Sequence, residues 1–141
     1  MIEPSVWSKL HGAATHFPIA LMIISALCDG VSFFSNDAGL RRSYRFTGTL
    51  TIVLGALGSY AAVLTGLVMT KGQIWGHATL LHHHQFIWPA FALMTGLATW
   101  RSVSSTEPSR KAAAIYLVLL ILSAGLVSGA GYWGGELLNQ G

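Results

Sequence analysis

The sequence predicts an all-α integral membrane four-helix bundle, formed by residues 1–141 as a single transmembrane domain. Two observations on composition and one on pattern lead to this fold class. The chain is 52% hydrophobic and only 9% charged, and its mean hydropathy is +0.56. Soluble domains usually carry about 25% charged residues, so a soluble fold would lack a polar surface. Charged and turn-forming residues also divide the chain into four apolar runs.

The four apolar runs cover roughly residues 11–34, 46–69, 82–100 and 112–133. A hydrocarbon core of about 30 Å needs about 20 helical residues at a rise of 1.5 Å each. Within lipid, a helix is the only single segment that satisfies all its own backbone polar groups. The first run is too long for a signal peptide and no basic region precedes it, so we expect it to be a membrane span.

The basic residues indicate the orientation of the predicted bundle. Six lie in the connections on one side, namely Arg41, Arg42, Arg45, Arg101, Arg110 and Lys111. The other side has only Lys9 and Lys71. Because cytoplasmic loops are rich in Lys and Arg, we expect both termini to be periplasmic in a bacterial inner (cytoplasmic) membrane. Eight scattered basic residues are too few for a nucleic-acid partner.

One helical face of the first run carries polar side chains and a carboxylate. Its members are His11, Thr15, Pro18, Met22, Ser25 and Asp29. A carboxylate at the centre of a span costs about 2.5–3.5 kcal/mol on the insertion scale, so Asp29 should face the bundle interior. Two interpretations stay open for Asp29: snorkelling or pairing with Arg41 or Arg45, and a role in proton transfer.

Small residues predict where the helices pack closely. The second run has a stripe of them at Gly48, Gly55, Ser59, Ala62 and Gly66. Shorter pairs occur in the third run, at Ala92 and Gly96, and in the fourth, at Gly125 and Gly129. In lipid such residues let helix backbones approach one another. The alternative is that these glycines leave room for a flat cofactor.

All six histidines lie in two short stretches, "HGAATHFPIALM" and "GHATLLHHHQFIW". The predicted topology brings both stretches to the outer half of the membrane. Four roles are open: axial ligation of haem iron between facing helices, a Cu or Zn site with His11, His77 and His82 as ligands, hydrogen bonding to a quinone or proton relay, and anchoring at the headgroups.

Haem ligation is the role we favour, because two histidines on different helices at one depth suit a membrane-embedded b-type haem. His16 with His84 is the first choice of axial ligands, and His83 is a close second to His84. His11 and His77 would ligate a second haem or bond the propionates. Which of His82, His83 and His84 faces His16 stays open.

The stretch "HGAATHFPIAL", from His11 to Leu21, resembles the opening signature of a family of small bacterial membrane proteins known only as a domain of unknown function. The resemblance continues in "LTG" at residues 64–66, in a histidine at the start of the third run and in "GGELL" at residues 134–138. The triplet at residues 82–84 departs from the single histidine usual in the family. The resemblance implies a four-helix membrane domain, found near or fused to cytochrome-type redox proteins.

These observations predict a haem b electron-transfer subunit of a membrane oxidoreductase complex rather than a stand-alone enzyme. Its histidine site would face the periplasm. Expected partners are the lipid bilayer, other subunits of the complex, a c-type cytochrome and the quinone pool. The alternative is a non-redox accessory subunit whose small residues pack against a larger complex and whose histidines only anchor it, or a Cu or Zn site.

Overall fold

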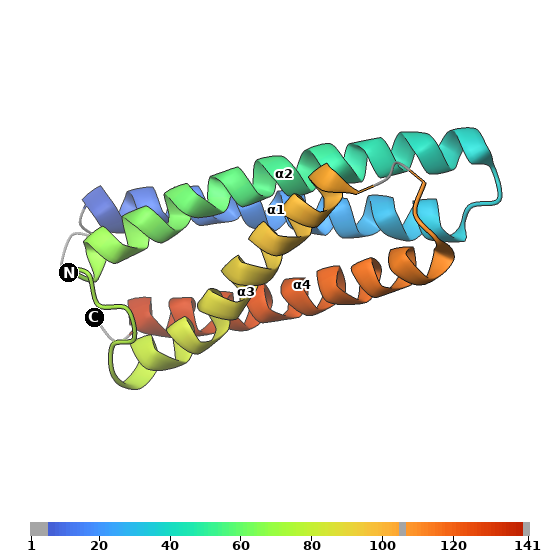
Figure 1. Cartoon of the computed structure of the whole chain (residues 1–141). Helices are drawn as coiled ribbons and strands as arrows, with labels where there is room; N and C mark the ends of the chain where they lie inside the picture. Colours follow the sequence, from blue (N-terminus) through green and yellow to red (C-terminus); the bar gives the residue numbers. More distant parts are fainter. Residues whose placement is uncertain (1–5, 105–106, 140–141) are drawn as a thin grey trace.

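The computed structural model describes residues 6–104 and 107–139. They form four helices, α1 (Val6–Phe34), α2 (Ala38–Met69), α3 (Ala78–Val103) and α4 (Arg110–Asn139) (Figure 1). The predicted all-α bundle is confirmed. Each helix contains its predicted apolar run and extends beyond it at one end or both, because polar residues such as those at 38–45 continue the helix outside the lipid-compatible stretch.

Helices α1, α2 and α4 are long and apolar enough to cross a membrane. The 26-residue α3 has sufficient length, but it carries His82, His83, His84 and Arg101, which lower its hydropathy. Large apolar side chains point outward along the bundle, including Leu27, Leu57, Leu64, Val118 and Ile121. In water such a surface would cause aggregation, whereas lipid tails solvate it. The chain is a membrane protein.

The four helices form two antiparallel hairpins, α1–α2 and α3–α4 (Figure 1). A three-residue connection joins the first pair, and the Asp37 carboxylate caps α2 by accepting a 2.7 Å hydrogen bond from the Leu40 amide. Helix α3 crosses the bundle obliquely, beginning beside α4 and ending beside α2 (Figure 1). The start of α1, the end of α4 and the α2–α3 connection lie at one end of the bundle, which we call the histidine end (Figure 1).

The two hairpins are copies of one pattern. The buried residues Pro18, Met22, Ser25 and Asp29 of α1 correspond, 72 positions further along, to Ala90, Met94, Leu97 and Arg101 of α3, all buried. Buried residues of α2 and α4 correspond in the same way, at an interval of 68 positions. The α2 members are Gly48, Ile52, Gly55, Ser59 and Ala62, and their α4 counterparts are Tyr116, Leu120, Ser123, Val127 and Ala130. The buried positions of the two hairpins therefore follow the same spacing, and we call positions related in this way equivalent.

The packing of small residues follows the predictions only in part. The stripe on α2 packs against α1: a Cβ at Gly55 would lie 3.4 Å from the Leu21 Cβ, and one at Gly48 would lie 3.0 Å from the Asp29 carboxylate. Gly129 likewise receives the Phe86 ring. Gly96 and Gly125, one member of each of the two shorter pairs, were also expected to bring helices together. A Cβ built at either glycine has no side chain or neighbouring helix within 4 Å. Those two glycines are exposed, because the buried face of each helix lies at neighbouring positions of the helical turn.

The apolar core lies in the middle of the bundle. Met22, Ile52 and Leu120, from three helices, are fully buried, and Met94 and Leu97 of α3 pack with them. Along every helix this layer separates the histidine end from the opposite end, where Asp29 and Arg101 lie. The two polar regions of the interior are thus divided by a layer of close-packed hydrocarbon.

Candidate functional site

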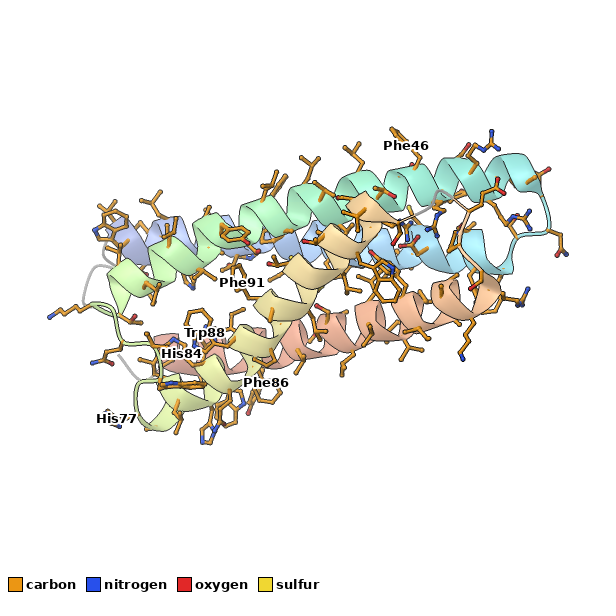
Figure 2. The ribbon with its side chains drawn as sticks, viewed as in Figure 1. Phe46, His77, His84, Phe86, Trp88 and Phe91 are labelled. Carbon is orange, nitrogen blue, oxygen red and sulfur yellow. The ribbon has the colours of Figure 1, made fainter. Side chains whose placement is uncertain are left out.

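A cavity of about 390 Å³ lies at the histidine end of the bundle and is lined by all four helices. Its size falls within the range of about 300–1,000 Å³ typical of small-molecule and cofactor sites. Most of the lining is apolar, and four of its polar side chains are histidines: His11, His16, His83 and His84. Figure 2 shows His84, Trp88 and Phe91 of α3 in this part of the bundle.

The cavity lies between the two equivalent halves. The α1 residues that line it, at positions 11, 12, 15, 16, 18 and 19, correspond to lining residues of α3 at 83, 84, 87, 88, 90 and 91. The α2 positions 59, 62, 63, 66, 67 and 69 correspond to α4 positions 127, 130, 131, 134, 135 and 137. A ligand in the cavity therefore meets the same set of positions from both hairpins.

His11 and His83 are equivalent in these halves, and their rings are held in the same way. The Nδ1–H of His11 donates to the Ala62 carbonyl on α2 at 2.9 Å, and that of His83 donates to the Ala130 carbonyl on α4 at 2.8 Å. Ala62 and Ala130 are themselves equivalent positions. Each bond thus ties one helix of a hairpin to the other and fixes the orientation of an imidazole ring.

A glycine one turn beyond each of these alanines makes room for the ring. A Cβ at Gly66 would lie 2.9 Å from the His11 ring, and one at Gly134 would lie 3.4 Å from the His83 ring. Both positions were noted from the sequence, Gly66 as part of a packing stripe and Gly134 in a family motif. The structure gives them a further role as seats for the two imidazoles.

The hydrogen bonds determine which ring nitrogen of each histidine is available to a ligand. A carbonyl oxygen only accepts, so Nδ1 of His11 and of His83 must carry the proton. In the neutral ring Nε2 then has a free lone pair. Within the described residues no hydrogen bond engages either Nε2 atom. This pattern, Nδ1–H on a backbone carbonyl and Nε2 unprotonated, is the usual arrangement of metal-ligating histidines.

The two histidines ranked first from the sequence also line the cavity, but they are held differently. His16 is exposed, and its Nδ1 bonds the Gly12 carbonyl one turn back on its own helix. His84 is 6% exposed, its Nδ1 has no hydrogen-bond partner among the described residues, and its ring lies next to the backbone carbonyls of Ile74 and Trp75. Their equivalents in the other half are Trp88 and Gly12, so neither belongs to a symmetric pair.

The structure does not bring His77 or His82 to the cavity. His77 is exposed at the start of α3 (Figure 2), and the ring of His82 stacks on Trp133, with 4.6 Å between the ring centroids, outside the cavity lining. Of the histidines considered for haem or metal binding, four therefore share one site and two lie outside it. No group of three or more His, Cys, Asp or Glu side chains is arranged to hold a metal ion within residues 6–104 and 107–139.

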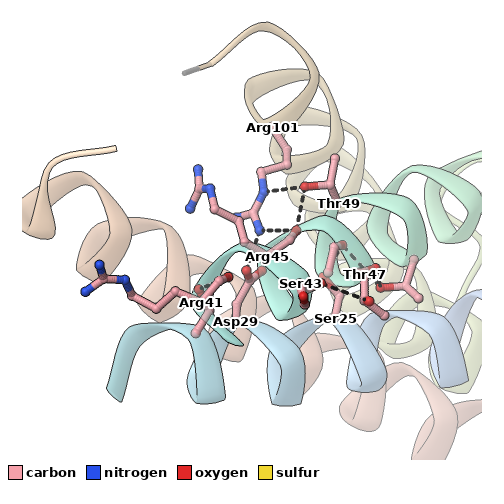
Figure 3. Close-up of polar contacts among 11 residues, drawn as sticks. Ser25, Asp29, Arg41, Ser43, Arg45, Thr47, Thr49 and Arg101 are labelled. Atoms are coloured by element: carbon pink, nitrogen blue, oxygen red, sulfur yellow. Dashed lines mark hydrogen bonds and ion pairs between the residues drawn. The ribbon is translucent and has the colours of Figure 1, made fainter. Parts of the chain in front are cut away.

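A second buried polar cluster lies beyond the apolar core. Asp29 of α1 forms an ion pair with Arg101 of α3, as Figure 3 shows, and both side chains are almost fully buried. Arg101 also donates to Thr49 Oγ1 at 2.8 Å and to the Arg45 carbonyl at 3.0 Å. The prediction that Asp29 faces the bundle interior is confirmed.

Two expectations about these charges are wrong. The ion-pair partner of Asp29 is Arg101, and not Arg41 or Arg45. Arg101, counted from the sequence as a loop residue, lies inside α3 because its charge is neutralised there. It therefore belongs to the interior and carries no topology information, which leaves five basic residues on that side against two.

The comparison with protein families identifies the family to which the chain belongs. Residues 8–140 match the family described as "Predicted membrane protein (DUF2231)", which is nearly the whole chain. No curated protein and no solved structure matches it. The chain's resemblance to a membrane family of unknown function, first indicated by the stretch at His11–Leu21, is thus confirmed.

Proposed function

We propose that this chain, which belongs to the DUF2231 family of predicted membrane proteins, binds a b-type haem between its two hairpins and transfers electrons as a subunit of a membrane redox complex. The observation that carries the proposal is the pair His11 and His83. These two imidazoles come from equivalent positions on α1 and α3, line one cavity, and are each held through Nδ1 with Nε2 unengaged.

The number of available imidazoles favours haem over a bare metal ion. Structural Zn sites need four protein ligands and catalytic sites three, whereas haem iron already has four porphyrin nitrogens and needs only axial ligands. Two histidines, one from each hairpin, would supply the ligands that haem iron still needs. Haem supplies a one-electron redox couple when bound, and the protein sets its potential through the ligands and the surrounding burial.

His11 and His83 replace His16 and His84 as our first choice of axial pair. The rings of His11 and His83 are fixed by carbonyls of a neighbouring helix at equivalent positions, whereas the exposed His16 bonds a carbonyl of its own helix and the buried His84 has no equivalent histidine in the other half. His16 and His84 would then contact the macrocycle from the cavity wall, beside Trp88. One haem is the expected number, since the symmetric pair occurs once.

The location of the cavity bears on the partners. The apolar layer of Met22, Ile52 and Leu120 separates the cavity from the opposite end of the bundle. Electron exchange would therefore take place at the histidine end, for which the distribution of basic residues favours the periplasmic side of a bacterial inner membrane. A c-type cytochrome, another subunit of the complex, or quinol from the bilayer would exchange electrons there.

Haem content of single-histidine variants tests the proposal. Purified wild-type protein should contain haem, whereas His11→Ala and His83→Ala should each lose most of it, because one axial ligand is absent. His77→Ala and His82→Ala are matched controls outside the cavity and should retain it. Haem is measured by the pyridine haemochrome spectrum, and folding by helical circular dichroism.

The variants His16→Ala and His84→Ala separate the two possible pairs. Loss of haem in these two with retention in His11→Ala and His83→Ala would support the sequence-based pair and overturn the assignment made here. Haem loss in none of the four would reject haem ligation by these histidines altogether. A wild-type protein with bound copper or zinc but no haem would favour the metal-site alternative.

A further inference from the structure

The segment Thr70–His77, which connects α2 to α3, borders the histidine cavity at its first residue. Its first residue Thr70, the preceding Met69 and the following Leu80 all line the cavity. Figure 1 shows it as the loop that joins the two hairpins at the histidine end. We call this segment the strap.

A side-chain hydrogen bond from Trp88 fastens the middle of the strap to the bundle. The indole Nε1–H of Trp88 donates to the Ile74 carbonyl at 2.7 Å. The ring of Trp88 is also part of the cavity wall, and its centroid lies 6.0 Å from that of His84. The strap carbonyls in turn lie next to the His84 ring, so the strap helps to bury this histidine.

Apart from these contacts, the middle of the strap is weakly held. The side chains of Ile74 and Trp75 are 56% and 57% exposed. No backbone–backbone hydrogen bond joins Ile74, Trp75 or Gly76 to any other residue the structure describes. Segments with few buried contacts and few backbone hydrogen bonds are the ones that open locally at low cost.

Residues in the left-handed region of the backbone map lie near both ends of the strap, the last of them being Ala78, the first residue of α3. Lys71 and Gly72 have φ of 54° and 78° at the first end, and Gly76 and Ala78 have φ of 67° and 49° at the second. This conformation is disfavoured for Lys and Ala, and such strain is concentrated at sites that switch. Lys71 and Ala78 are therefore two points of backbone strain on either side of a loosely held middle.

We propose that the strap is a lid over the histidine cavity, with the Trp88–Ile74 hydrogen bond as its latch, and that its opening admits the occupant of the cavity from the outer side. The opposite route is closed by the apolar core. This inference rests on the proposed function only in taking the cavity as the binding site, and its test requires no haem.

The test measures access to the cavity with a cysteine reporter. In a Cys28→Ser background, Val63→Cys places one thiol in the cavity wall, and its labelling by a charged, water-soluble maleimide is followed in detergent. Trp88→Phe removes the N–H donor but keeps an aromatic ring. Loss of one hydrogen bond shifts a local opening equilibrium by about fivefold, so labelling should accelerate by about that factor.

Two controls separate opening of the strap from general loosening. Val53→Cys places the thiol on the same helix but outside the cavity lining. Its labelling rate should be the same with and without the Trp88→Phe substitution. Trp75→Phe, which changes an exposed strap indole, should leave the Val63→Cys rate unchanged. Equal rates for Val63→Cys in the two backgrounds would overturn the lid, as would parallel acceleration at Val53→Cys. Either of these two results would reject the lid without bearing on whether the protein binds haem, which the haem content of the histidine variants tests separately.

Discussion

At the scale of single residues, the interior contains two polar pairs, each at equivalent positions of the two hairpins. His11 and His83 lie at one end, and Asp29 and Arg101 at the other. The first pair is identical in the two halves, whereas the second has opposite charges. An identical carboxylate at both sites would place two like charges in an apolar interior, so the difference allows the halves to associate.

The ion pair should be essential for stability. Asp29→Asn leaves the Arg101 charge buried without its counter-ion, and we expect a loss of about 3–5 kcal/mol in the free energy of unfolding. Denaturant titration in detergent, followed by circular dichroism, measures it. The exchange Asp29→Arg with Arg101→Asp should recover part of the loss.

The exposed pair of Arg42 and Glu107 is the control for this experiment. A guanidinium nitrogen of Arg42 lies 3.4 Å from Oε1 of Glu107, but the two side chains are 82% and 79% exposed. Water screens such a pair, so Arg42→Ala should change stability by less than about 1 kcal/mol. An Asp29→Asn protein as stable as the wild type would show that the buried pair does not hold the hairpins together.

At the scale of helices, glycine has two functions that the sequence pattern does not distinguish. Gly66 and Gly134 face a histidine ring, whereas Gly96 and Gly125 meet no neighbouring side chain. Gly66, Gly96 and Gly125 all lie in small-residue patterns of the kind that mediates helix packing in lipid. Periodicity identifies helices and an apolar interior, but which face meets which neighbour depends on the oblique crossing of α3, and this tertiary feature has no local signal.

Alanine substitution should separate these two functions. Gly66→Ala would place a Cβ 2.9 Å from the His11 ring, so His11 must shift and its bond to the Ala62 carbonyl weakens. We expect reduced ligand occupancy and a lower thermal transition. Gly96→Ala meets no atom and gains helix propensity, so its stability should be unchanged or higher by up to about 1 kcal/mol. Equal effects of the two substitutions on thermal unfolding would exclude a ring seat at Gly66.

At the scale of the whole molecule, the fold and the general location of the candidate site were predictable from the sequence. Four apolar runs predicted the helices, and the two histidine stretches predicted a site at one end. The pair His11 and His83 was not predicted, because helical position alone cannot reveal that the Ala62 and Ala130 carbonyls hold these rings. A signal was present nevertheless: His11 and "ALM" at residues 20–22 recur as His83 and "ALM" at residues 92–94, 72 positions later.

This internal repeat explains the form of the site. Two hairpins of the same design each contribute one imidazole, one glycine seat and one carbonyl to a shared cavity. A metal centre between the halves would have two ligands in matched surroundings. The asymmetric residues of the cavity, His16 and His84 with Trp88, would then distinguish the two sides of the bound group.

The most direct test of this account is the reduced-minus-oxidised absorption spectrum of the purified wild-type protein. We expect a b-type haem spectrum with the sharp α-band of a low-spin iron, because two imidazoles would supply its protein ligands. The band should disappear in the double variant His11→Ala with His83→Ala. A wild-type protein that is fully folded in detergent, supplied with haem during expression, and without any such band would contradict the central claim.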